Sequence, residues 1–263
     1  GDSLASADSD DRIYYYEDFL LMIRFEHVTK KIGGRVILDD LSFSVNRGEI
    51  FAVVGPSGVG KSVTLKHIVG LLSPDSGSIW FDGEKVCFAD DRELERLRTR
   101  CGYLFQSGAL LGWMTVAENI ALPLTEKGKL SENEISLRVN KMLELTGLTD
   151  AADKLPAEIS GGMHKRAGLA RALITEPEVV LFDEPTSGLD PIMSKSIHEL
   201  ILSLKQKLGG TGVLVTHDLA GALQIADRIA LLKDGRFCAV LSPEEFRASN
   251  MPEVREFLSA VSK

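Results

Sequence analysis

A glycine-rich segment that directly follows an apolar run constrains the fold of this chain more than any other feature. Residues 55–62 read GPSGVGKS and fit the pattern G-x-x-x-x-G-K-[ST]. The preceding run, Ile50–Val54, is continuously apolar and predicts a strand buried on both faces. The following residues, from Ser62 to Leu72, predict a helix. Strand, loop and helix in this order predict an α/β fold.

The chemistry that this loop predicts is the binding of ATP together with Mg²⁺. Its glycines let backbone N–H groups face inward, and the next helix directs its positive end at the phosphates. Lys61 is expected to reach the β- and γ-phosphate oxygens, and the Ser62 hydroxyl to ligate Mg²⁺. The alternative, a chance glycine-rich turn, is disfavoured by the flanking strand and helix. The predicted ATP-binding residues here are Gly55, Pro56, Ser57, Gly58, Val59, Gly60, Lys61, Ser62 and Val63.

A second motif places two acids at the end of another apolar run. Val179–Phe182 predicts a buried strand, and Asp183 and Glu184 close it. Asp183 is expected to hold Mg²⁺ through the water shell of the ion, and Glu184 to polarise the attacking water as a general base. A solvated acidic pair at a strand end is the alternative, and the phosphate-binding loop elsewhere in the chain disfavours it.

The rest of the chain divides into an acidic start and one long domain. Residues 1–21 are predicted to be a processed or added extension, and residues 22–263 one domain. Alternation in Leu41–Val45 predicts sheet, and residues 107–178, which lack a convincing buried strand, predict an inserted helical subdomain. Helix starts are marked by capping boxes at Thr115 with Glu118, Ser131 with Glu134, and Ser242 with Glu245.

Composition narrows the classes of function. A chain of 263 residues that is 44% hydrophobic supports one core with an attached subdomain. No apolar run approaches the roughly 20 residues of a membrane-spanning helix, so a peripheral membrane role and a cytoplasmic location are expected. A net charge of −8 argues against a nucleic-acid partner. Cys87, Cys101 and Cys238 form no disulfide or zinc pattern and are interpreted as reduced packing residues.

From Met22 to Lys263 these motifs resemble, in type and order, the ABC ATPase family. Residues 159–163, ISGGM, look like its signature sequence, with Ser160 as the N-cap of a helix and Gly161 and Gly162 exposing backbone N–H groups. In this family the signature of one protomer closes on the ATP of another, which implies a head-to-tail pair with a second copy. A plain N-cap is the alternative. The fold implied is a mixed-sheet ATPase core with an antiparallel β subdomain and an inserted α-helical subdomain.

Three single residues take roles from the same resemblance. Gln106, after the predicted strand 101–105, resembles the glutamine that senses Mg²⁺ and the attacking water and that links to the membrane partner. Asp190 matches the loop along the dimer interface, near the bound nucleotide. His217 resembles the switch histidine, which hydrogen-bonds the γ-phosphate. With Glu184, Gln106 and His217 are therefore the predicted catalytic residues, and Gln106 joins Ser62 and Asp183 as a predicted Mg²⁺ contact.

Two positions depart from the family pattern. Ile32 stands where the family usually has an aromatic residue that stacks on adenine, so we expect weaker stacking or a contact from elsewhere. Met163 ends the signature where glutamine is commonest, which removes an amide that would contact the ribose of the partner-bound nucleotide.

The sequence around the motifs, in residues 105–119, 160–167 and 254–258, is similar to that of the ATPases of Mla/Mce-type phospholipid transport systems. That likeness implies a membrane permease and periplasmic lipid-binding Mce-type components as partners, at the cytoplasmic face of the inner membrane. We expect Leu110, Leu111, Trp113 and Met114 to form an apolar groove for a permease helix. Packing of the helical subdomain is the alternative for these four side chains.

The sequence thus predicts the ATP-binding and ATP-hydrolysing subunit of an ABC transporter for phospholipid. An ABC ATPase for another cargo is the nearest alternative. An ABC protein acting on ribosomes or DNA is disfavoured because the chain has one cassette and no heptad insertion. A module that holds ATP without cleaving it is disfavoured by the presence of Lys61, Asp183, Glu184 and His217.

Overall fold

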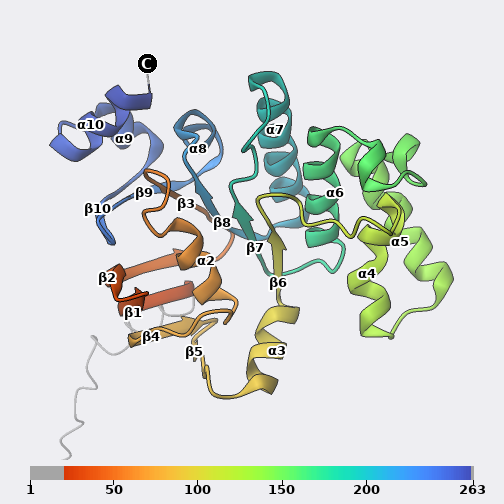
Figure 1. Cartoon of the computed structure of the whole chain (residues 1–263), viewed down its shortest axis with the longest axis horizontal. Coiled ribbons are helices and arrows are strands. Elements are labelled where there is room, and N and C mark those ends of the chain that lie inside the picture. Colours follow the sequence, from red (N-terminus) through yellow and green to blue (C-terminus); the bar gives the residue numbers. More distant parts are fainter. Residues whose placement is uncertain (1–20, 262–263) are drawn as a thin grey trace, which may run out of the picture.

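A six-stranded mixed sheet forms the centre of the molecule (Figure 1). The computed structural model describes residues 21–261, without the side chains of Leu208 and Val261. The sheet has the order β10-β9-β3-β8-β7-β6, and only β10 is antiparallel to its neighbour. Its strands are β3 (Ile50–Val54), β6 (Cys101–Leu104), β7 (Val179–Asp183), β8 (Thr211–Thr216), β9 (Arg228–Lys233) and β10 (Arg236–Leu241).

A four-stranded antiparallel sheet packs beside this centre, in the order β2-β1-β4-β5. Its strands are β1 (Leu21–Ile32), β2 (Arg35–Asn46), β4 (Ser76–Phe81) and β5 (Glu84–Lys85). Asp82 and Gly83 join β4 to β5 with φ of 56° and 77°, the positive values that a tight hairpin turn needs. Strands β4 and β5 therefore form a hairpin with Asp82 and Gly83 as its turn.

The central strands are buried on both faces because their side chains alternate between two cores. In β3, Ile50, Ala52 and Val54 face the core that also contains residues of the helices between Val116 and Leu204. Phe51 and Val53 face the other core, which contains the antiparallel sheet and the helix that follows the phosphate-binding loop. All five residues of β3 are buried, which confirms the strand expected from the continuously apolar run.

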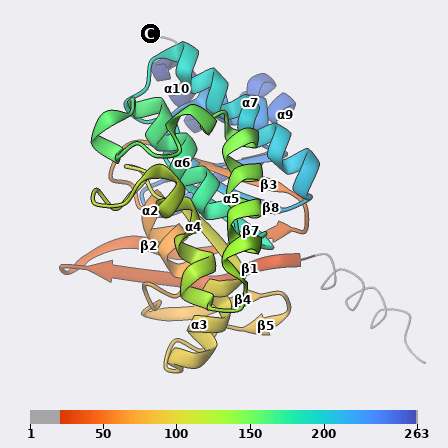
Figure 2. The same cartoon turned by 90° about the vertical axis from the view of Figure 1, so that its right-hand side faces the viewer.

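Helices cover both faces of the central sheet (Figure 2). Residues 107–178 consist of helices and loops. No strand lies between Leu104 and Val179, as expected, and all three predicted capping boxes are present. The helices are α2 (Lys61–Ile68), α3 (Asp91–Thr99), α4 (Val116–Lys127), α5 (Glu132–Thr146), η1 (Thr149–Ala151), η2 (Pro156–Glu158), α6 (Gly161–Leu173), α7 (Pro191–Leu208), α8 (Leu219–Ile225), α9 (Pro243–Ala248) and α10 (Pro252–Val261).

Helix α6 joins the helical region to the centre. It packs against α4 and α5 on one side and against β6 and α7 on the other. Its residues Ala167, Leu169, Ala170 and Leu173 belong to the same core as Ile50 and Val54 of β3. Residues 107–178 therefore share a core with the sheet, and their status as a separate subdomain stays a prediction.

Four details differ from the expectations. Helix α2 ends at Ile68 rather than at Leu72, because Gly70 turns the chain with a φ of 65°. Strand β6 ends at Leu104, so Phe105 lies in the following loop. Cys87 is exposed, so the packing role is wrong for this cysteine, whereas burial raises the pKa of Cys101 to about 12. The extension predicted for residues 1–21 lies outside the described residues except for Leu21, which begins β1.

Across residues 21–261, no helix has both the length and the apolar character needed to cross a bilayer.

Two glycines with similar backbone angles allow a test of the antiparallel sheet. Gly77 and Gly83 both have positive φ, but a Cβ at Gly77 would lie 2.3 Å from the His27 carbonyl oxygen, whereas one at Gly83 meets nothing within 4 Å. We expect Gly83→Ala to lower the free energy of unfolding by about 1 kcal/mol and Gly77→Ala by more than about 2 kcal/mol. Urea unfolding followed by tryptophan fluorescence measures both, and equal losses would contradict the predicted backbone clash.

Candidate active site

The predicted phosphate-binding loop lies between β3 and α2 and forms the floor of a pocket of about 330 Å³. The pocket is lined by Ile32, Ile37, Ser57, Gly58, Gly60, Lys61, Ser62, Val63, Gln106 and Glu184. Gly60 has a φ of 112°, and a Cβ there would come within 3.0 Å of the Ile37 carbonyl oxygen. Any other residue at this position would strain the turn that leads into α2.

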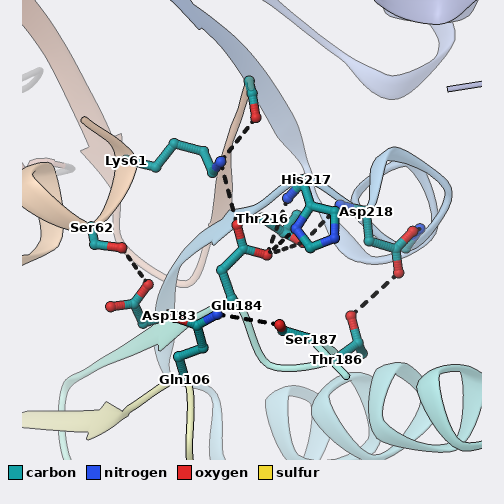
Figure 3. A network of polar contacts seen from close by, with 12 residues as sticks. Lys61, Ser62, Gln106, Asp183, Glu184, Thr186, Ser187, Thr216, His217 and Asp218 are labelled. Atoms are coloured by element: carbon teal, nitrogen blue, oxygen red, sulfur yellow. Dashed lines mark hydrogen bonds and ion pairs between the residues drawn. The ribbon is translucent and has the colours of Figure 1, made fainter. Parts of the chain in front are cut away.

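Lys61 begins α2 and turns its side chain back over the loop (Figure 3). The ammonium group donates to the carbonyl oxygens of Gly55, at 2.9 Å, and Pro56, at 3.1 Å. It also lies 3.3 Å from Oε1 of Glu184, and only 6% of the Lys61 side chain is exposed. The buried positive charge is thus held at the mouth of the loop, next to the acid that was predicted to be the general base.

The two residues predicted to contact Mg²⁺ beside the loop touch each other. The Ser62 hydroxyl donates to Oδ1 of Asp183 at 2.7 Å, and the Tyr103 hydroxyl donates to Oδ2 at 3.1 Å. Burial, with the Asp183 carboxylate as a further cause, raises the pKa of Tyr103, so this phenol keeps its proton and remains a donor. Hydroxyl and carboxylate oxygens are ligands that suit Mg²⁺.

Ser62 and Asp183 would hold Mg²⁺ together with water and nucleotide phosphates, the ligands that this ion commonly keeps. Within residues 21–261 no group of three His, Cys, Asp or Glu side chains is arranged to hold a metal.

Glu184 connects the end of β7 to the end of β8. Its Oε2 accepts from the imidazole Nδ1 of His217 at 2.7 Å, from the His217 N–H at 3.2 Å and from the Thr216 hydroxyl at 3.3 Å (Figure 3). Its backbone has a φ of 49°, a left-handed value that is uncommon for a residue with a side chain. Two of the three predicted catalytic residues, Glu184 and His217, are thus in direct contact.

Gln106 reaches the same pocket from the loop after β6. Its side-chain amide donates to the Ser187 hydroxyl at 3.2 Å, and Ser187 lies three residues beyond Glu184. The structure therefore brings together Lys61, Ser62, Gln106, Asp183, Glu184 and His217, each from the end of a strand or from the following loop or helix.

The predicted signature residues lie apart from this pocket. Ser160 caps α6 by accepting from the Met163 N–H at 3.3 Å, and Gly161 and Gly162 form the first turn. Asp190 caps α7 by accepting from the N–H groups of Ile192 and Met193. Within one chain these four residues do not line the pocket, so their predicted contact with nucleotide requires a second copy.

Sequence reasoning missed three residues of the site. Tyr103 and Thr216 donate to the two acids, and the Lys165 ammonium group donates to the Gln106 carbonyl and, at 3.3 Å, to the Glu184 carbonyl. Burial lowers the pKa of Lys165, against the opposing effect of Glu184 and Asp183. The position of Tyr103 in a strand leading to Gln106 was a usable signal, whereas no spacing marks Lys165 as inward-facing.

Two aliphatic side chains also line the pocket, Ile37 and Ile32, of which Ile32 is 45% exposed. Ile32 is the residue that stands where the family usually has an aromatic ring.

This fold and site define a class of protein, the ATPases with a phosphate-binding loop between a buried strand and a helix. The chain belongs to the ABC transporter family, whose model matches residues 38–187. The expected ATP-binding and ATP-hydrolysing subunit of an ABC transporter is thereby confirmed.

Relatives extend the likeness over most of the chain. The intermembrane phospholipid transport system ATP-binding protein MlaF of Haemophilus influenzae is 42% identical over 241 residues, 92% of this chain and 91% of that protein. MlaF of Escherichia coli K12 is 43% identical over 230 residues, 88% of this chain and 86% of that protein. A probable ribonucleotide transport ATP-binding protein, mkl of Mycobacterium leprae, is 41% identical over 237 residues, 90% of this chain and 68% of that protein.

Solved structures share the fold. CbiO1 of Clostridium perfringens, part of the ABC transporter complex CbiONQ, superposes with a TM-score of 0.80 at 30% identity and covers 91% of this chain and 98% of its own. The ATP-binding cassette MJ0796, in a dimeric post-hydrolysis state bound to ADP and phosphate, gives a TM-score of 0.78 at 34% identity, with 84% and 99% covered. The predicted α/β fold with a mixed and an antiparallel sheet is confirmed.

Removing the Lys61 ammonium tests the pocket directly. Because a charge-assisted hydrogen bond to phosphate contributes about 2 kcal/mol, we expect Lys61→Ala to weaken Mg-ATP binding about 30-fold or more in calorimetry. Lys66→Ala is the matched control, since Lys66 is an exposed lysine of the same helix. Unchanged binding by Lys61→Ala would rule out this loop as the phosphate site.

Proposed function

We propose that the chain energises a phospholipid transporter by hydrolysing Mg-ATP at the pocket around Lys61 and Glu184. The single observation that carries the catalytic assignment is the contact of Glu184 with both Lys61, at 3.3 Å, and His217, at 2.7 Å. The cargo is inferred from two MlaF proteins, which are named for intermembrane phospholipid transport and match 92% and 88% of this chain. The mkl protein, named for ribonucleotide transport, represents the competing cargo.

In the proposed reaction Glu184 acts as a general base on water. Its Oε2 is oriented by three donors from Thr216 and His217, which leaves the side chain directed into the pocket. Lys61 stabilises negative charge on the phosphates, and His217, whose Nδ1–H is donated to Glu184, donates to the terminal phosphate through its other ring nitrogen when Nε2 also carries a proton. Mg²⁺ held by Ser62 and Asp183 would supply further positive charge on the phosphate oxygens. Gln106, which also lines the pocket, holds the attacking water.

The proposed active unit is a pair of copies related head to tail. The exposed Ser160 and Gly161 lie at the positive N-terminal end of α6, a 13-residue helix. Neither residue lines the pocket of its own chain. Asp190 is exposed at the start of α7. The MJ0796 cassette, which is dimeric and was captured with ADP and phosphate, supports the pairing.

The proposed permease contact is the loop 110–114. Asn119, fully buried in α4, pins this loop: its side chain accepts from the Leu111 N–H at 2.7 Å and donates to the carbonyls of Leu111 and Met114 at 3.0 Å. Trp113 is nevertheless 76% exposed. A rigid loop that presents an exposed tryptophan favours an interface over internal packing, although Leu110 packs partly against the core.

The proposed location follows from this contact and is the cytoplasmic face of the membrane that holds the permease. CbiO1, as part of the CbiONQ transporter complex, supports assembly of such a subunit with transporter partners. Periplasmic Mce-type lipid-binding components complete the proposed system and are inferred from the phospholipid transport named for the MlaF relatives.

Substitution of the proposed base tests both hydrolysis and pairing. Glu184→Gln keeps the shape of the side chain but removes its basicity, so we expect the ATPase rate to fall at least about 100-fold while Mg-ATP binding persists. The uncleaved nucleotide should hold two copies together, which size-exclusion chromatography with and without Mg-ATP would detect. A Glu184→Gln variant that hydrolyses ATP at the normal rate and elutes as a monomer would refute the proposal.

Truncation of the exposed tryptophan tests the permease contact. In the copurified membrane complex, Trp113→Ala should lower ATPase activity at least about fivefold, because a buried aromatic anchor is lost from the interface. Its Mg-ATP affinity should stay unchanged. Leu137→Ala is the control, since Leu137 is 71% exposed on α5, away from the loop. Equal activity in all three complexes would exclude loop 110–114 as the coupling surface.

A further inference from the structure

Lys165 is a buried cation whose hydrogen bonds both go to the site. The residue lies in the second turn of α6 and is 5% exposed. Its ammonium group donates to the backbone carbonyl of Gln106, in a short contact, and to the backbone carbonyl of Glu184 at 3.3 Å. One side chain thus binds the main chain of two residues that were proposed to act on the attacking water.

The contact with Glu184 falls on a strained piece of backbone. Glu184 has a φ of 49°, a value that costs about 1 kcal/mol or more for a residue with a Cβ and persists only where the surroundings enforce it. Its N–H donates to the Val215 carbonyl at 2.9 Å, and its carbonyl accepts from the Lys165 ammonium at 3.3 Å and from the Ser187 N–H at 3.2 Å. These three hydrogen bonds fix the peptide groups on either side of the strained residue, which determines where its carboxylate points.

The second hydrogen bond of the Lys165 ammonium holds the main chain of Gln106, a residue that lines the pocket. The Gln106 side chain is exposed and donates to Ser187, whereas its carbonyl is held from below by Lys165. A hydrogen bond from an ammonium group is stronger than one between neutral groups, and a carbonyl buried without a donor is costly. Loss of Lys165 would leave the Gln106 carbonyl without this donor and the Glu184 carbonyl with the Ser187 N–H alone, so both loops would be held less firmly.

We propose that Lys165 is a positioning residue for ATP hydrolysis, which acts through the main chain of Glu184 and Gln106. This inference rests on the proposed catalytic role of Glu184. Lys165 is not among the residues that line the pocket. Its effect is on the geometry of the two loops, so it alters the rate of the chemical step and leaves the affinity for ATP intact.

The test compares Lys165→Met, which removes the donor but keeps the length of the chain, with Lys165→Arg, which keeps a buried cation. We expect Lys165→Met to lower kcat about tenfold or more with a KM for ATP within about threefold of the original. Lys165→Arg should restore kcat to within about threefold. Calorimetry with Mg-ATP, on the same samples, should give equal affinities for all three proteins.

The neighbouring residue supplies a matched control. Arg166 also sends a cation from α6 to a backbone carbonyl, that of Thr146, and to the Ser196 hydroxyl, but both partners lie away from the site. We expect Arg166→Met to lower the melting temperature as much as Lys165→Met and to leave kcat within about twofold. A similar loss of kcat in both variants would reduce Lys165 to a packing role and overturn the proposal.

The remaining outcomes are also decisive. A normal kcat in Lys165→Met, or a loss of ATP affinity that accounts for its slower rate, would overturn the proposal. If Lys165→Met does not fold, Lys165→Gln serves instead: a lower kcat supports the role of the charge, and a normal kcat rejects it. Glu184→Gln, measured in parallel, separates the two claims, because an active Glu184→Gln refutes the proposed base, whereas an inactive one with a fully active Lys165→Met refutes only the role of Lys165.

Discussion

Burial of the parallel strands on both faces is the constraint on which the site depends. Because β3, β6, β7 and β8 run parallel and pack against a core on each side, their carboxyl ends meet at one edge of the sheet. The residues that follow these ends are the phosphate-binding loop, Gln106, Glu184 and His217. Positions up to 162 residues apart along the chain, from Gly55 to His217, are thereby brought to one pocket, without any of them having to be adjacent in sequence.

The ionisable side chains at this edge all have hydrogen-bond or ion-pair partners. Lys61 faces Glu184, Glu184 faces His217, and Asp183 is satisfied by the hydroxyls of Ser62 and Tyr103. A buried charge without such partners would be strongly destabilising. The same pairings also hold the side chains in single orientations, so the groups that stabilise the folded site are those that give it a defined geometry for phosphate chemistry.

Most of the fold and most of the residues that meet at the site could be predicted because their signals are local. Three kinds of signal each occupy a few consecutive residues: the loop 55–62, the buried run ending at Asp183, and the capping boxes. The interactions that stabilise these local structures are made between residues close together in the sequence, so the sequence pattern is enough to predict them. Lys165 and Asn119 could not be found in this way. Their partners lie on other elements, and a helical lysine or asparagine is more often exposed. The packing role predicted for Cys87 is wrong for the same reason, since the tertiary structure decides whether a side chain is buried, and Cys87 is exposed.

Helix α6 illustrates how a single element serves two surfaces. Its first turn carries the exposed Ser160 and Gly161, which in the proposed pair face the nucleotide of the other copy. Lys165 follows five residues after Ser160, about 140° around the helix, and points into its own chain beneath Gln106 and Glu184. One helix therefore connects the surface that is proposed for pairing with the main chain of Gln106 and Glu184. The strained backbone at Glu184, with its φ of 49°, is held by three hydrogen bonds, and the one from Lys165 is the contribution of this helix.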